Sequence, residues 1–174
     1  MNLSKVFLRF GQLLALTVLA LTGPSLQACE QQTTDLQQIN TANLPQFVSQ
    51  ISADYYQQLE SLLKYYELYQ QKRDPRGFNV WHLRGFSPAL AKQQAYYQQL
   101  QATASAESQP TVEKLITVFN ELDTISTQLM VSFRENNPAA YQQAKTLITD
   151  NNAFLATQLK EYQLDDEIRD ITLN

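Results

Sequence analysis

The sequence predicts an all-α fold, an antiparallel four-helix bundle that follows a cleaved signal peptide and a flexible tether. Three observations support this fold class. Apolar residues recur at steps of three and four along most of the chain, which is the period of a helix face. Proline repeatedly stands where a helix would take its first residue. No segment combines alternating β-branched residues with the turn signals of a hairpin.

Residues 1–28 have the layout of a secretory signal peptide and are excluded from the expected fold. Lys5 and Arg9 supply a positive start, and an apolar run follows over residues 12–21. This run is too short to span a membrane, which needs about 20 apolar residues. Cleavage removes two of the 13 basic residues and none of the 17 acidic ones, which leaves a mature chain with a net charge of −6.

The sequence Leu26-Gln27-Ala28-Cys29 resembles a lipobox, the cleavage and lipidation signal of bacterial lipoproteins. The resemblance implies that Cys29 receives a diacylglyceryl group, becomes the N-terminus and is then acylated, with palmitate as a typical chain. Acyl chains anchor a protein because each buried CH₂ contributes about 0.8 kcal/mol. Because Glu30 follows the cysteine, the resemblance also implies an outer-membrane lipoprotein that faces the periplasm. The alternative is ordinary cleavage after Ala28, which gives a soluble periplasmic protein with a free thiol.

Residues 29–43 are polar and rich in Gln and Thr, and they predict a lipid-anchored tether, so that the helical domain would occupy residues 44–174. The first helix is expected over 44–72, with Asn43 as its N-cap and Pro45 in its first turn. Its apolar stripe consists of Val48, Ile51, Tyr55, Leu59, Leu62, Tyr66 and Tyr69.

Three further helices are expected, each with proline at its first position. Four amphipathic helices with short connections favour an up-down-up-down arrangement, and a chain of this size buries enough surface to fold without a disulfide or a metal. The acidic C-terminus is expected to fray or to form a short extra turn. The expected ranges are 88–105 after Ser87, 110–136 after Gln109 and 138–162 after Asn137.

Residues 72–86 are expected to form a long loop between the first two helices. This segment holds the only Trp and the only His of the chain, and the tripeptide Arg-Gly-Phe occurs in it twice. A loop of this length in a compact domain is usually either functional or disordered, and this one is too aromatic to be disordered. The segment is therefore the first place to look for a function.

Two hypotheses for this segment remain open. In the structural one, its apolar side chains fill the space left by a short second helix, and its arginines pair with helix carboxylates. Those apolar side chains are Phe78, Val80, Trp81, Leu83 and Phe86. In the functional one, a cleft binds an anionic group or an acidic partner segment, because Arg and Trp are enriched at binding hot spots and guanidinium groups bind carboxylates bidentately. The candidate binding residues are Arg73, Arg76, Trp81, His82 and Arg84.

Composition narrows the classes of function. A single cysteine excludes an internal disulfide and a Cys/His metal cluster, and the negative net charge argues against binding of nucleic acid. No nucleophile motif accompanies His82, and the acidic run at 165–170 lacks the spacing of a calcium loop, so we expect no enzyme, no cofactor and no metal. The sequence therefore predicts a non-enzymatic lipoprotein that binds or stabilises an envelope protein. The alternative is a binding module for a small anionic or glycan ligand, held by residues 72–86.

Overall fold

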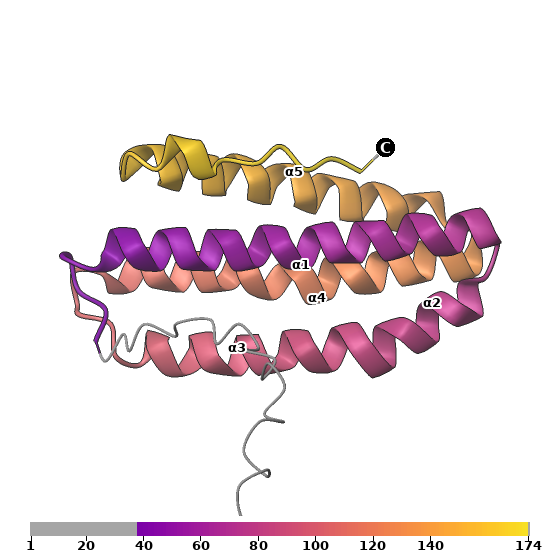
Figure 1. The fold of residues 1–174 in the computed structure, drawn as a ribbon, viewed down its shortest axis with the longest axis horizontal. Helices are drawn as coiled ribbons and strands as arrows, with labels where there is room; N and C mark the ends of the chain where they lie inside the picture. Colours follow the sequence, from indigo (N-terminus) through magenta and orange to yellow (C-terminus); the bar gives the residue numbers. More distant parts are fainter. Residues whose placement is uncertain (1–37, 174) are drawn as a thin grey trace, which may run out of the picture. The chain divides into compact units, whose positions relative to one another are not determined.

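The structure is a computed structural model that describes residues 38–173, and every regular element in this range is a helix (Figure 1). The all-α prediction is confirmed for this part of the chain. The signal peptide, the lipobox and Cys29 lie outside the described residues. No helix within residues 38–173 combines the length and the apolar character that a membrane span requires. The same range contains no group of three or more His, Cys, Asp and Glu side chains that could hold a metal ion.

Helix α1 spans Leu44–Lys72, as the sequence predicts. Asn43 does not cap it with its side chain; instead its Oδ1 accepts a hydrogen bond from the backbone N–H of Asn40 at 2.7 Å and shapes the preceding turn. The helix ends at Arg73, whose left-handed conformation (φ 51°) lets its N–H donate to the Gln70 carbonyl. The buried face of α1 includes Phe47, Val48, Ile51, Tyr55, Tyr56, Leu59, Leu62 and Tyr66.

The segment predicted to be a long loop is helical, and this prediction was wrong. α2 spans Pro75–Trp81, a π-helical turn η1 spans His82–Phe86, and α3 follows directly as Ser87–Gln101. Asp74 caps α2, because its side chain accepts a hydrogen bond from the Gly77 N–H at 2.8 Å. The pair Asp74-Pro75 is the same kind of start signal that opens the other helices.

Pro88 stands in the first turn of α3, as predicted, but the helical backbone continues from η1 into α3 without a break. A proline in an α-helix lacks an N–H, and its ring collides with the carbonyl four residues earlier. The π-turn just before it changes this hydrogen-bond register, because the Ser87 N–H donates to the carbonyl of His82, five residues back. The wider turn explains how the chain passes Pro88 without interruption.

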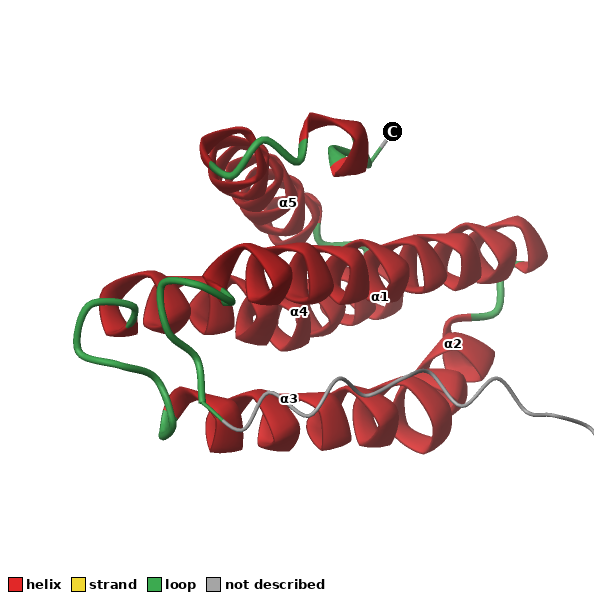
Figure 2. Ribbon diagram, turned by 60° about the vertical axis from the view of Figure 1, so that its left-hand side comes forward, coloured by secondary structure: helices red, strands yellow, loops and turns green. Residues whose placement is uncertain are grey.

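Helices α4 (Gln109–Glu135) and α5 (Pro138–Glu161) agree with the predicted ranges. Asn137 is the N-cap of α5, since its Oδ1 accepts hydrogen bonds from the N–H groups of Ala139 and Ala140. α4 packs against α1, α3 and α5, so its buried face lies at the centre of the apolar core. Figure 1 shows the long helices side by side, and Figure 2 shows α5 inclined to α1 and α4.

Both ends of the described chain pack more closely than the sequence suggests. Ile39, placed in the flexible tether, is fully buried, and its carbonyl accepts a hydrogen bond from the Ser105 N–H at 2.7 Å. Ile39 thus packs against the helical domain within the stretch that the sequence assigns to the tether. At the other end, a 3₁₀ turn, η2, covers Asp165–Glu167, and Leu173 is buried. The expected extra turn is present.

Candidate functional site

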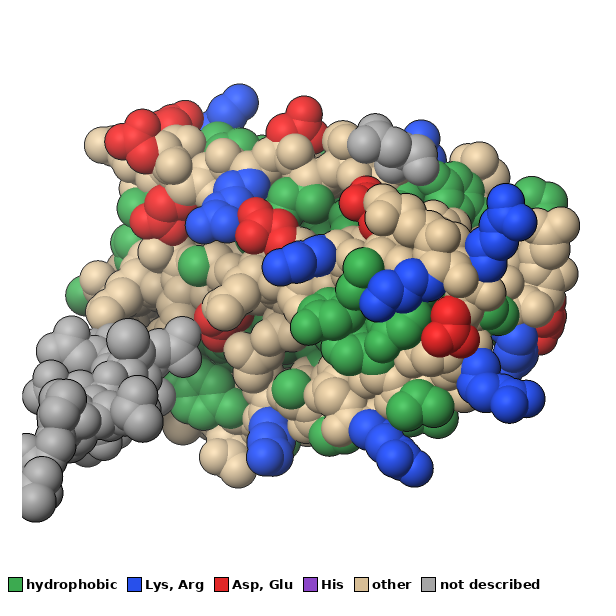
Figure 3. Space-filling view, turned by 45° about the vertical axis from the view of Figure 1, so that its right-hand side comes forward, with side chains coloured by type: hydrophobic (Ala, Val, Ile, Leu, Met, Phe, Trp, Pro, Cys, Tyr) green, Lys and Arg blue, Asp and Glu red, His purple; other side chains and the backbone are tan. Residues whose placement is uncertain are grey.

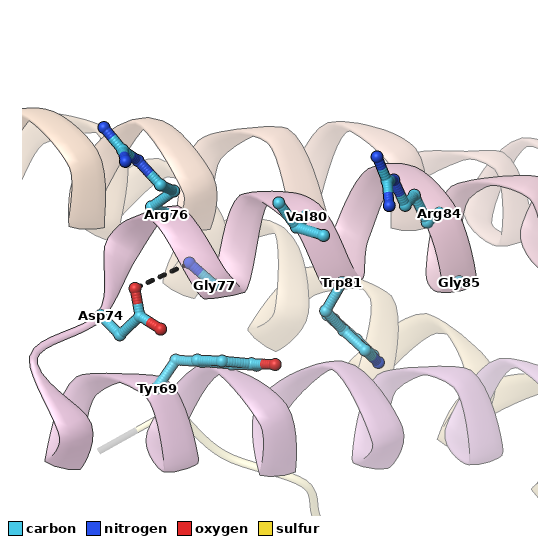
Figure 4. A pocket seen from close by; sticks show the side chains of 8 residues that line it. All are labelled: Tyr69, Asp74, Arg76, Gly77, Val80, Trp81, Arg84 and Gly85. Atoms are coloured by element: carbon cyan, nitrogen blue, oxygen red, sulfur yellow. Dashed lines mark hydrogen bonds between the residues drawn. The ribbon is translucent and has the colours of Figure 1, made fainter.

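A shallow groove of about 640 Å³ lies where α2 and η1 pass over the end of α1 (Figure 4). It opens widely to solvent. We call it the Trp81 groove, after the only tryptophan of the chain. Its lining residues are Tyr69, Asp74, Arg76, Gly77, Val80, Trp81, Arg84 and Gly85.

The floor of the Trp81 groove is part of an aromatic cluster. The Trp81 indole stacks on the ring of Tyr65 with 4.3 Å between ring centroids, and it lies 5.7 Å from Phe78 and 5.5 Å from Phe86. Phe78 is fully buried and also contacts Phe133 of α4. Because one rigid cluster joins α1, α2, η1 and α4, it fixes the position of the indole.

Two glycines on either side of Trp81 give the groove its shape. A methyl group at Gly77 would lie 2.7 Å from Cε1 of Tyr69 and 2.2 Å from the Asp74 carboxylate, so only glycine allows α2 to approach α1 this closely. A methyl group at Gly85 would meet only the Trp81 ring edge, at 3.8 Å from Cδ1 and Nε1. Gly85 therefore leaves that edge of the indole uncrowded.

The arginines of this segment form no ion pair with any described residue. Arg76 and Arg84 are exposed, and Figure 4 shows both extending from the side of the helix that faces away from α1, with Val80 between them. The structural hypothesis included pairing of these arginines with helix carboxylates, and no such pair forms among residues 38–173. Two guanidinium groups thus stand at the groove with their donors available to a partner.

The largest exposed apolar side chains gather at the same end of the molecule. Leu83 is 57% exposed, Val80 43% and Leu68 36%. Figure 3 shows apolar side chains gathered on this face, with basic side chains spread around them. The structural hypothesis holds for Phe78 and Phe86, which are buried, and fails for Val80 and Leu83, which remain in contact with solvent. An exposed apolar patch with a polar rim is typical of a protein-interaction surface.

His82 lies on the opposite, buried side of η1. Its Nε2 is 2.9 Å from the Ser126 hydroxyl oxygen, and that hydroxyl donates to the Asp123 carbonyl, so Nε2 carries the proton and donates to Ser126. Nδ1 is buried without a partner in the described chain. Burial lowers the pKa of His82, and the nearby negative charge of Asp123 opposes this effect. His82 is therefore a neutral residue of the η1–α4 contact.

The structure brings together three of the five predicted binding residues, Arg76, Trp81 and Arg84. Arg73 ends α1 and does not line the Trp81 groove, and His82 points into the core. Sequence reasoning did not find Tyr65 and Tyr69 as parts of this site. They stand four residues apart and thus share a helix face, which is the signal that could have found them.

Comparison with protein-family models, with curated proteins and with solved structures found no match for this chain.

Proposed function

We propose that this protein is a membrane-anchored, non-enzymatic lipoprotein of the bacterial envelope that binds a partner protein through the Trp81 groove. In this proposal the four long helical segments form an antiparallel four-helix bundle, and one end of that bundle presents the groove. The observation that carries the proposal is the meeting of unpaired arginines with the most exposed apolar side chains at one place. Such a surface has both the apolar area and the directional donors that protein interfaces use.

A glycan or another flat ligand fits the groove less well. Sugar recognition by aromatic residues uses a free ring face, and the Trp81 indole has Tyr65 stacked against it. The Tyr69 ring carries the Lys72 ammonium group 5.7 Å from its centroid. The open, shallow shape also favours a protein surface, since pockets for small molecules enclose most of their ligand.

The membrane anchor in this proposal is Cys29, with acyl chains that hold the protein at the outer membrane. The lipobox resemblance supports this anchor. The negative charge of the mature chain also supports it, because such a chain has no general attraction to anionic lipid and needs another means of attachment. Incorporation of labelled palmitate, and its loss in Cys29→Ala, tests the anchor. Labelling that persists in Cys29→Ala would overturn the assignment.

Site-specific photo-crosslinking in intact cells tests the binding surface. A photoreactive residue at Leu83, an exposed position next to the groove-lining Arg84 in the chain, is expected to give a discrete crosslinked product with an envelope protein. The same residue at Gln57, an exposed position of α1 away from the groove, serves as the control and is expected to give none. Equal products from both positions, or none from Leu83, would contradict the proposal.

A further inference from the structure

We propose that the partner segment bound by the Trp81 groove is a helix that carries two carboxylates two turns apart, with an apolar side chain between them. This inference rests on the proposed function and adds the chemistry of the partner. It follows from the placement of Arg76, Val80 and Arg84 along one side of α2 and η1 (Figure 4).

The spacing of the two arginines sets the spacing of the partner's charges. Arg76 and Arg84 are eight residues apart, so their Cα atoms are separated by about 12 Å along the helix axis. Two carboxylates two turns apart on a facing helix have nearly the same separation. Each arginine can then bind one carboxylate bidentately, which is the strongest pairing that this side chain forms.

The exposed apolar side chains determine what lies between those charges. Val80 stands between the two arginines, and Leu83 is the most exposed large apolar side chain of the described range. An apolar side chain of the partner, placed between its carboxylates, would cover Val80 and Leu83.

The walls of the groove favour a helix over an extended peptide. They are helical, and their backbone groups are engaged within α1, α2 and η1. An extended segment would find no sheet edge here and would leave its own N–H and C=O groups without partners, whereas a helix satisfies its own backbone. The groove therefore favours a segment whose backbone hydrogen bonds are formed within the segment itself.

An anionic lipid surface is a weaker match to the same arginines. The groove is concave, and the Asp74 carboxylate lines it, which repels a headgroup that carries only negative charge. A helical segment can place its carboxylates near Arg76 and Arg84 and a neutral side chain near Asp74. Charge complementarity thus favours a protein segment.

Fluorescence of Trp81 tests the proposal directly, because it is the only tryptophan of the chain. The full chain, reconstituted in neutral phosphatidylcholine vesicles, would be titrated with a helix-forming peptide that has two glutamates two turns apart, leucine between them, and no Trp or Tyr. We expect a saturable change in emission. We expect binding at least about tenfold weaker for the peptide with both glutamates replaced by glutamine, and weaker binding for glutamates one turn apart.

Matched protein variants distinguish a specific effect of the groove arginines from a general effect of net charge. Arg76→Gln with Arg84→Gln is expected to weaken binding of the acidic peptide at least about tenfold. Lys145→Gln with Lys160→Gln removes the same charge from exposed positions of α5 and is expected to leave it unchanged. Circular dichroism of each variant establishes that it is folded.

Three results would overturn the inference. They are equal affinity for the glutamate and glutamine peptides, no saturable response, and an emission shift caused by phosphatidylglycerol vesicles without any response to peptide. If one of these occurs while the photoreactive residue at Leu83 still gives its crosslinked product, only the chemistry assigned to the partner is wrong. If the crosslinked product is absent as well, the proposed function also fails.

Discussion

Residues 73–86 and the C-terminal residues 163–173 both carry arginine on the surface, but the arginines of the two segments have different surroundings. In the C-terminal segment, Arg169 donates a hydrogen bond to the Glu60 carboxylate at 2.9 Å. Asn152 donates to the carbonyl of Ile171 at 2.7 Å. This segment has little regular structure, yet the rest of the protein provides partners for the Arg169 side chain and the Ile171 carbonyl.

Residues 73–86 are regular helix over most of their length, and Asp74 and His82 have hydrogen-bond partners, but the arginines take part in no ion pair with residues 38–173. Three exposed arginines form no ion pair there, whereas Arg134 and Arg169, the other described arginines, are each paired with a glutamate. The lack of ion pairs is thus confined to the arginines of residues 73–86 and is not shared by the other described surface arginines. This difference supports the proposal that the Trp81 groove binds another molecule.

The largest effect on stability is expected from a substitution in the floor of the groove. Phe78→Ala removes a fully buried ring that contacts Tyr66, Tyr69, Trp81 and Phe133, and it should lower the free energy of unfolding by about 3–5 kcal/mol. Urea unfolding measures this change. Leu83→Ala on the rim should stay within about 0.5 kcal/mol of the wild type, because a side chain in solvent loses little packing. Equal losses would remove the distinction between floor and rim.

The second-largest effect on stability is expected at Gly77, and Gly85 serves as the comparison. Gly77→Ala forces a methyl group against Tyr69 and Asp74 and should cost about 1–3 kcal/mol of stability. Gly85→Ala meets no close atom, and alanine favours helix, so it should leave stability unchanged or raise it by up to about 1 kcal/mol. Thermal unfolding of both variants checks the pair. A stable Gly77→Ala protein would show that α1 and α2 are not in close contact.

A third prediction concerns the pH dependence of stability at His82. Burial lowers its pKa from the ordinary value of 6.5, so the unfolded chain binds a proton that the folded chain excludes. The free energy of unfolding should fall as the pH drops below 6.5, by at most about 1.4 kcal/mol per pH unit. Urea unfolding across this window, compared with His82→Asn, isolates the effect. Identical pH slopes for both proteins would mean that His82 is protonated in the folded state.

The smallest effects on stability are expected from the arginines, and they compare residues 73–86 with residues 163–173. Arg169→Gln breaks an exposed ion pair and should cost about 0.2–1 kcal/mol. Arg76→Gln with Arg84→Gln breaks none and should leave stability within about 0.5 kcal/mol of the wild type. Chemical unfolding of the two variants side by side measures the difference. A loss from the double variant larger than that from Arg169→Gln would show that the groove arginines stabilise the fold.

The helix ranges were predictable where an apolar stripe follows a clear start signal. The ranges of α1, α4 and α5 agree with prediction because each has a long buried face and proline in its first turn. α2 was missed although Asp74-Pro75 offers the same signal, since the glycines and the charged residues near it resemble a loop. Its helicity depends on the contact between Gly77 and Tyr69, which no local pattern contains.

The candidate site was predictable in part. The concentration of Arg and Trp in residues 72–86 led to the prediction of Arg76, Trp81 and Arg84, and these three residues line the Trp81 groove. The burial of His82 was not predictable, because the helix phase that turns it toward Ser126 depends on the π-turn. Ile39 shows the same limit, since one apolar residue in a polar stretch has no period to indicate that it is buried.

The most direct test of the central claim is the yield of crosslinked product from a photoreactive residue at Leu83 in three backgrounds. These are the otherwise wild-type chain, the chain with Arg76→Gln and Arg84→Gln, and the chain with Lys145→Gln and Lys160→Gln. If the groove binds a partner through its unpaired arginines, the yield should fall at least about tenfold in the second background and stay unchanged in the third. An undiminished yield from the folded Arg76→Gln, Arg84→Gln protein would contradict the account.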